Sequence, residues 1–152
     1  MKYNLQRFID AQQEYYEIAK SELSNGKKES HYMWFIFPQI QGLGHSPMAE
    51  YYAIADIDEA RQYLQNSTLK SNMEELINIL LNLESDNAED IFGFPDDMKL
   101  KSSMTLFKLA EPNNERFNKI LQKFYKGDLD EHTTQILEIQ KQKNKIYLKN
   151  NI

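Results

Sequence analysis

Apolar side chains recur every three or four residues along most of this chain, which is the spacing of helices that bury one face. In residues 5–24 the stripe contains Leu5, Phe8 and Leu23, and Asn25-Gly26 follows it as a left-handed stop. No segment shows the strict alternation of a half-buried strand. Comparable stripes predict further helices over residues 58–65, 68–83, 98–110, 114–126 and from 131 onward.

Short polar residues ahead of these stripes predict where helices begin, because their side chains accept hydrogen bonds from free backbone N–H groups. Ser46 before Pro47 is a strong start for a short helix over residues 48–55, and Asp56 with Glu59 has the spacing of a capping box. The pattern therefore predicts an all-α fold, a single compact domain over residues 1–152 with seven or eight short helices. Other expected caps are Asn4, Asp86 (with Glu89), Asp96 or Asp97, Asn113 and Asp130.

Composition narrows the function classes. With 41% hydrophobic and 12% aromatic residues, the chain has enough apolar surface to fold rather than stay disordered. The absence of cysteine excludes thiolate catalysis, disulfides and cysteine-ligated zinc. The three histidines lack HxxxH or HExxH spacing, so we expect neither a metal site nor a cofactor.

Hydropathy and net charge limit the cellular locations and the classes of partner that we expect. The sequence turns polar too soon for a secretory signal, and no apolar run approaches the roughly 18 residues of a membrane span. We therefore expect a cytoplasmic protein without a membrane partner. A net charge of −5 and a pI near 5.2 argue against nucleic acid, which usually binds a basic surface. We interpret the basic run over residues 141–151 as a solvated helix end or tail.

Residues 31–50 (HYMWFIFPQIQGLGHSPMAE) break the helical pattern. They hold the single tryptophan, two of the three histidines, two of the four prolines and two of the five glycines. The aromatic half must end at Pro38, but its spacing does not distinguish a helix from a strand. Its aromatic side chains, Trp34 among them, either fill the core or form the wall of a site that stacks a base or a sugar.

Two irregular segments are candidates for a site: the first over residues 41–47 (QGLGHSP) and the second over residues 92–97 (FGFPDD). Both carry glycine and proline at the start of a predicted helix, where free N–H groups and the helix dipole attract anions such as phosphate. Neither matches a dinucleotide fingerprint or a P-loop, so a plain connector is the alternative. The expected ligand-binding residues are Trp34, Gln39, Gly42, Gly44, Ser46, Phe92, Gly93, Asp96, Lys99, Ser102 and Ser103.

Three side chains are candidates for acid–base catalysis in such a site. His45 lies on the first irregular segment and belongs to the residue type that titrates near neutral pH. Glu50 and Asp97 lie near the starts of the two following helices, where an apolar surrounding would favour their protonated form. The alternative is that both carboxylates are caps or partners of the helix dipole. Lys99 shares a helix face with two serines, so an ammonium and a hydroxyl can jointly hold a phosphate. His132 is interpreted as a surface residue.

Three blocks resemble a bacterial family known as domain of unknown function 1810: HYMWFIFPQIQGLG, SPMAEYY and IFGFPDDMKLKSSMTLF. The resemblance covers about residues 5–140, and its most specific parts are the WFxFPQ and DxxKLxSSMTLF patterns. It implies a mostly helical fold and no established activity, and these residues do not support the label calpastatin that the family sometimes carries. Tyr32 stands where the family often has tryptophan.

A fainter likeness, in order and rough spacing, is to the NADAR group of glycosidases, which act on ADP-ribosyl or ribosylamine N-glycosidic bonds. It is carried by Glu50-Tyr51-Tyr52 and by Phe92-Gly93, Lys99, Leu100 and Met104. This likeness implies phosphates at the helix starts, a base on the aromatic residues and Glu50 as acid/base.

The sequence leaves two hypotheses open. One is a protein that binds or hydrolyses a nucleotide or ADP-ribose-like ligand at an N-glycosidic bond, with a phosphate-containing small molecule as its partner. The other is a non-catalytic module that binds a protein or a peptide through its aromatic groove.

Overall fold

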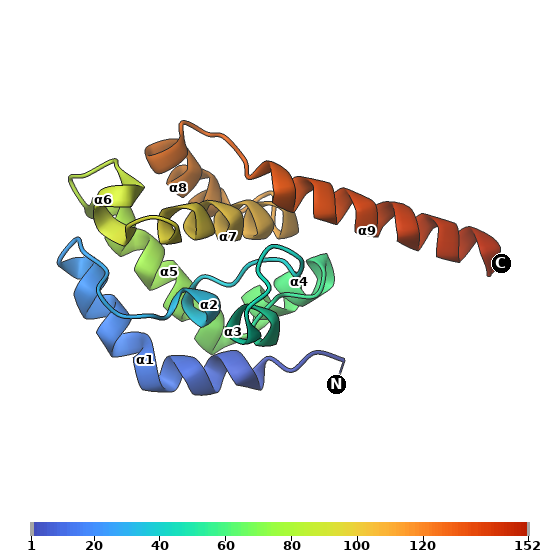
Figure 1. The fold of residues 1–152 in the computed structure, drawn as a ribbon, viewed down its shortest axis with the longest axis horizontal. Coiled ribbons are helices and arrows are strands. Elements are labelled where there is room, and N and C mark those ends of the chain that lie inside the picture. The colour runs from blue at the N-terminus through green and yellow to red at the C-terminus, as the bar shows by residue number, and fades with distance from the viewer. Residues whose placement is uncertain (1, 152) are drawn as a thin grey trace.

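The computed structural model describes residues 2–151, which form nine helices and no strand (Figure 1). The all-α prediction is confirmed, and the number of helices exceeds the predicted seven or eight because two very short ones form beside the irregular segments. The helices are α1 (Gln6–Ser24), α2 (Met33–Ile36), α3 (Pro47–Tyr51), α4 (Ile57–Gln65), α5 (Ser67–Asn82), α6 (Ala88–Phe92), α7 (Asp96–Ala110), α8 (Glu115–Tyr125) and α9 (Glu131–Asn150).

Helix α7 is the centre of the fold. It packs against α2, α4, α6, α8 and α9, and its residues from Ser102 to Phe107 are all buried. Six consecutive buried positions cover more than a full helical turn, so neighbours enclose α7 on every side. The ring of Phe107 lies between Tyr63 of α4 and Phe117 of α8, with ring centroids 5.2 and 5.7 Å away. These aromatic contacts join three helices in one core.

Several predicted caps form as expected, because each needs only a side chain and a backbone N–H three residues on. Ser46 Oγ accepts a hydrogen bond from the Ala49 N–H at 3.1 Å, and Asp56 Oδ1 accepts one from the Glu59 N–H at 2.9 Å. Asp130 Oδ2 accepts a hydrogen bond from the Thr133 N–H at 3.0 Å. These caps set the starts of α3, α4 and α9.

Other predicted caps are wrong. Asn87 and Asn114 cap α6 and α8, in each case the neighbour of the predicted residue. No side chain caps α1 or α7. Asp96 lies inside the first turn of α7, and its carboxylate contacts Lys28 Nζ at 2.7 Å and Lys99 Nζ at 3.3 Å. Two ion pairs take the place of the expected cap, because α7 begins beside the chain that follows α1.

Glu22 holds the turn that leads from α1 to α2. Its Oε1 accepts hydrogen bonds from the backbone N–H groups of Glu29 and Ser30 at 2.8 and 2.9 Å, and its Oε2 accepts one from Ser30 Oγ. Burial alone would raise the pKa of Glu22, but these hydrogen bonds outweigh burial and lower it. The ionised carboxylate is therefore part of the folded structure.

This arrangement predicts a loss of stability in acid. Because the folded pKa of Glu22 is lowered, its stabilisation is complete above the ordinary value of 4.5 and disappears as the pH falls through the folded pKa. We expect Glu22→Gln to be less stable than wild type at neutral pH and to lose less further stability in acid. Urea denaturation at neutral and acidic pH measures both effects, with Glu29→Gln as the exposed control. Equal pH dependence of wild type and Glu22→Gln would contradict this role.

Candidate functional site

A cavity of about 330 Å³ lies where the two irregular segments meet, and we call it the inter-segment cavity. The segments are about fifty residues apart in the sequence, so the fold brings together two regions that were predicted to share a site. The lining residues are Trp34 and Gln39, then Leu43, Gly44, His45, Ser46 and Ala49, then Pro95, Met98, Lys99 and Ser102 and, from the start of α9, Asp130 and His132.

The first irregular segment is held by a short backbone pairing and by close packing. The Gln41 N–H donates to the Ile54 carbonyl and the Ile54 N–H donates to the Gln39 carbonyl, both at 2.8 Å. A Cβ atom at Gly44 would come within 2.7 Å of the Ala49 Cβ. Only glycine therefore lets the segment lie this close to the first turn of α3.

The second wall of the cavity depends on the ion pairs of Asp96. The Lys28 side chain is only 5% exposed, so its contact with Asp96 anchors the start of α7 to the chain after α1. Asp96 also contacts Lys99, whose ammonium lies 5.5 Å from the centroid of the Trp34 ring. This distance is within the range of a cation–π contact. The cavity wall thus presents a cation beside an aromatic plane.

The start of α9 closes the cavity from a third side. The Asp130 N–H donates to Thr105 Oγ1 of α7 at 2.9 Å, which fixes the position of this helix start. The Asp130 carboxylate also accepts from Thr133 Oγ1 at 2.6 Å. His132 is exposed, as predicted, and it also lines the edge of the cavity. Nothing in the local sequence links it to segments that precede it by tens of residues.

The cavity is lined by two charged side chains and by several groups that can form hydrogen bonds. Lys99 is the lysine of the lining and pairs with Asp96, and Asp130 is the carboxylate of the lining and accepts the hydrogen bonds of its cap. Ser46 Oγ accepts from Ala49, so its hydrogen remains free to donate. Ser102 Oγ instead donates to the Met98 carbonyl at 3.1 Å. His45 and His132 add two imidazole side chains to the lining.

The structure brings together only part of the predicted site. Of the predicted residues, those that line the cavity are Trp34, Gln39, Gly44, His45, Ser46, Lys99 and Ser102. Gly42 lines a small adjoining hollow together with Trp34. Asp96 does not line the cavity but contacts Lys99, which does. Gly93 and Glu50 are exposed and do not line the cavity.

Three further predicted residues lie in the core or on another face. Phe92 is buried against Phe37, with ring centroids 6.1 Å apart, and Ser103 is fully buried. Asp97 is mostly buried near Tyr125, whose pKa is raised by burial and by the Asp97 carboxylate. On a helix, positions 98, 99 and 102 share one face and position 97 points away from it, whereas position 103, four residues after Lys99, lies at the edge of that face that turns into the core.

The aromatic run over residues 32–37 contributes to the core and to the wall of the inter-segment cavity. Tyr32, Phe35 and Phe37 are buried in the core, whereas the half-buried Trp34 lines the cavity. In residues 2–151 no group of three or more histidine, aspartate or glutamate side chains is arranged to hold a metal ion. Over the same residues, no helix combines the length and apolar character that a membrane crossing requires.

A family model described as "Protein of unknown function (DUF1810)" matches residues 2–137. The chain belongs to this family. The match agrees with the resemblance seen over residues 5–140, and it leaves the second half of α9 outside.

Among solved structures, the chain is similar to the crystal structure of the conserved hypothetical protein Rv1873 from Mycobacterium tuberculosis. The two chains are 41% identical with a TM-score of 0.88, over 91% of this chain and 99% of that chain. No curated protein matches the chain. The family and the similar structure therefore agree with the fold, and the cavity is the feature that bears on function.

Proposed function

We propose that the inter-segment cavity binds a small molecule that joins a flat ring to a phosphate, such as a nucleotide or an ADP-ribose-like compound. The observation that carries this proposal is the position of the Lys99 ammonium above the Trp34 ring in one cavity wall. An indole face stacks a base, and an ammonium pairs with a phosphate. The hydroxyl of Ser46 is free to donate a further hydrogen bond to the same anion.

The size of the cavity favours a mononucleotide. Its volume of about 330 Å³ is at the low end of the roughly 300–1,000 Å³ that is typical of ligand pockets. A ligand as large as ADP-ribose would extend beyond the cavity toward solvent. We therefore expect the ring and one phosphate to provide most of the binding energy.

If the bound ligand is hydrolysed, the two histidines are better placed than Glu50 to transfer protons. His45 and His132 line the cavity, whereas Glu50 is exposed outside it. A general acid or base must come within hydrogen-bond reach of the reacting group. The alternative of a peptide-binding module has less support here, because polar residues from three regions line the same cavity as Trp34.

The test uses the single tryptophan as a reporter. Trp34 lines the cavity, so its fluorescence is expected to change when nucleoside monophosphates, ADP-ribose or inorganic phosphate are titrated. We expect Lys99→Met to weaken binding of the phosphate-bearing ligands about ten- to a hundred-fold, because a hydrogen bond to a charged group contributes about 1.5–3 kcal/mol.

Lys101→Met is the matched control. Lys101 is on the same helix, but its ammonium lies 5.9 Å from the Tyr125 ring, and its side chain does not line the cavity. We expect this variant to bind like wild type. The absence of any fluorescence or calorimetric response at millimolar ligand, or an equal loss in both variants, would overturn the proposal.

A further inference from the structure

The second half of α9 forms an arm that extends from the body of the molecule (Figure 1). We define the C-terminal arm as residues 141–150, all of which are exposed. The last link to the body is the hydrogen bond from Gln140 Nε2 to the Ala55 carbonyl, at 2.9 Å. The family match ends at residue 137, so the arm lies outside the shared fold.

The arm has the composition of a helix that binds to another surface. Ile146, Tyr147 and Leu148 are 59%, 65% and 59% exposed. The arm carries four lysines and no acidic residue, so its charge is +4. Because the whole chain has a net charge of −5, the rest of the chain carries −9. The arm continues a helix that is anchored only as far as Gln140, so the turns of the arm gain no packing against the body. A partner surface that covers the apolar side chains would stabilise it.

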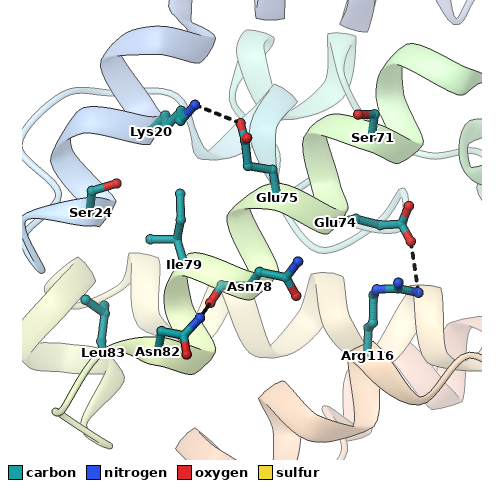
Figure 2. A pocket seen from close by; sticks show the side chains of 10 residues that line it. All are labelled: Lys20, Ser24, Ser71, Glu74, Glu75, Asn78, Ile79, Asn82, Leu83 and Arg116. Atoms are coloured by element: carbon teal, nitrogen blue, oxygen red, sulfur yellow. Dashed lines mark hydrogen bonds and ion pairs between the residues drawn. The ribbon is translucent and has the colours of Figure 1, made fainter.

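An open groove of about 770 Å³ lies across α5, as Figure 2 shows. Lys20 and Ser24 of α1 border one side, and Arg116 of α8 borders the other. The floor of the groove is a single stripe along α5 that consists of Ser71, Glu74, Glu75, Asn78, Ile79 and Asn82. Leu83 lies just beyond the end of this stripe. Short serine and asparagine side chains leave the groove hollow, while Ile79 and Leu83 give it an apolar end.

Acidic side chains of the groove are available to a basic helix. Glu75 contacts Lys20 Nζ at 3.3 Å and Glu74 contacts Arg116 Nη1 at 2.9 Å, and the two glutamate side chains remain 45% and 26% exposed. A carboxylate has about four acceptor sites, so each glutamate can also bind a lysine of an incoming helix. At 1.5 Å per residue, the floor from Ser71 to Asn82 is about 16 Å long, which matches the roughly 15 Å of the arm.

We propose that the C-terminal arm of one molecule binds in the α5 groove of a second molecule. The apolar side chains of the arm cover Ile79 and Leu83, and its lysines lie near Glu74 and Glu75. The arm cannot fold back into its own groove, because α9 continues straight beyond the Gln140 contact and away from the body (Figure 1). A body of charge −9 attracts the basic arm of another copy, whereas it repels a nucleic acid or an anionic membrane.

Arm and groove are different surfaces, so the contact is heterologous, and an open assembly keeps one free arm at one end and one free groove at the other unless a ring closes. This geometry provides a decisive test with two variants at exposed positions. Tyr147→Asp damages the arm, and Asn78→Arg fills the groove and repels the lysines. Gln62→Arg adds the same charge on α4, outside the groove, and is the matched control.

Sedimentation velocity of the full-length proteins tests the proposal. We expect the average mass of wild type and Gln62→Arg to rise with protein concentration and to fall with added salt. Tyr147→Asp and Asn78→Arg should each remain monomeric, with unchanged circular dichroism. An equal mixture of the two should form a 1:1 dimer and nothing larger, since one intact arm and one intact groove remain.

Two results would overturn the proposal. The first is wild-type protein that stays monomeric at the highest concentration measured, including the case in which it binds anionic vesicles or RNA instead. The second is association of wild type without dimer formation in the mixture, which would indicate a symmetric contact between two arms.

Discussion

Glu59→Ala is expected to lower the free energy of unfolding by about 3–5 kcal/mol, because it leaves a buried guanidinium without its counter-charge. The side chains of Glu59 and Arg7 are 2% and 9% exposed, and Glu59 Oε2 lies 3.0 Å from Arg7 Nη1. Arg7 also donates hydrogen bonds to the carbonyls of Tyr51 and Ala53, each at 2.9 Å. Glu59 Oε1 accepts a hydrogen bond from the Ala55 N–H at 2.7 Å.

The same substitution should weaken the inter-segment cavity. Arg7 ties α1 to the end of α3 and to the chain that follows it, and that chain pairs through Ile54 with the start of the first irregular segment. Urea denaturation measures the loss of stability, and Trp34 fluorescence measures the change near the cavity. Asp58→Ala is the control, because the Asp58 side chain is 64% exposed in its ion pair with Arg61. This substitution should lower the free energy of unfolding by less than about 1 kcal/mol. Equal costs for both variants would contradict the buried ion pair.

Phe107→Ala is expected to cost about 3–5 kcal/mol, the range for removing a buried phenylalanine from a packed core. Phe107 is 0% exposed and contacts the rings of Tyr63 and Phe117, so its loss leaves a cavity where α4, α7 and α8 meet. Tyr147→Ala is the control, because Tyr147 is 65% exposed on the arm and should change the stability of the dilute protein by less than about 0.5 kcal/mol.

Denaturant midpoints at low protein concentration compare these two aromatic truncations. We expect a large fall in the midpoint for Phe107→Ala with an unchanged slope, which would indicate lost stability in an otherwise similar folded state. A loss below about 1 kcal/mol for Phe107→Ala would be inconsistent with a central, fully enclosed α7.

The role of α7 could not be predicted from its own sequence. Its pattern predicts a helix, but whether Ser102 to Phe107 are enclosed depends on the helices that surround them. For the same reason the sequence could not tell that Ser102 lines the cavity while Ser103 is in the core. Asp96 illustrates a second limit: an ion pair with Lys28, from a distant part of the chain, replaces the local cap that its position predicts.

The candidate site was predictable as a pair of segments and not as a set of side chains. Both irregular segments carry glycine and proline at helix starts, and that pattern alone indicated that they could form one site. His132 and Asp130 entered the cavity only because Thr105 holds the start of α9 against α7. Glu50 has the right position in sequence but is exposed outside the cavity.

The sequence by itself determined the helical class of the fold, most helix boundaries and the two places where the chain is irregular. These features depend on the apolar period and on hydrogen bonds between residues a few positions apart, as at Ser46 and Asp56. Only the tertiary structure decided which face of each helix is buried, which charged groups pair and which side chains line the cavity beside Trp34. Those contacts join residues that are distant in sequence, so packing of the whole chain determines them.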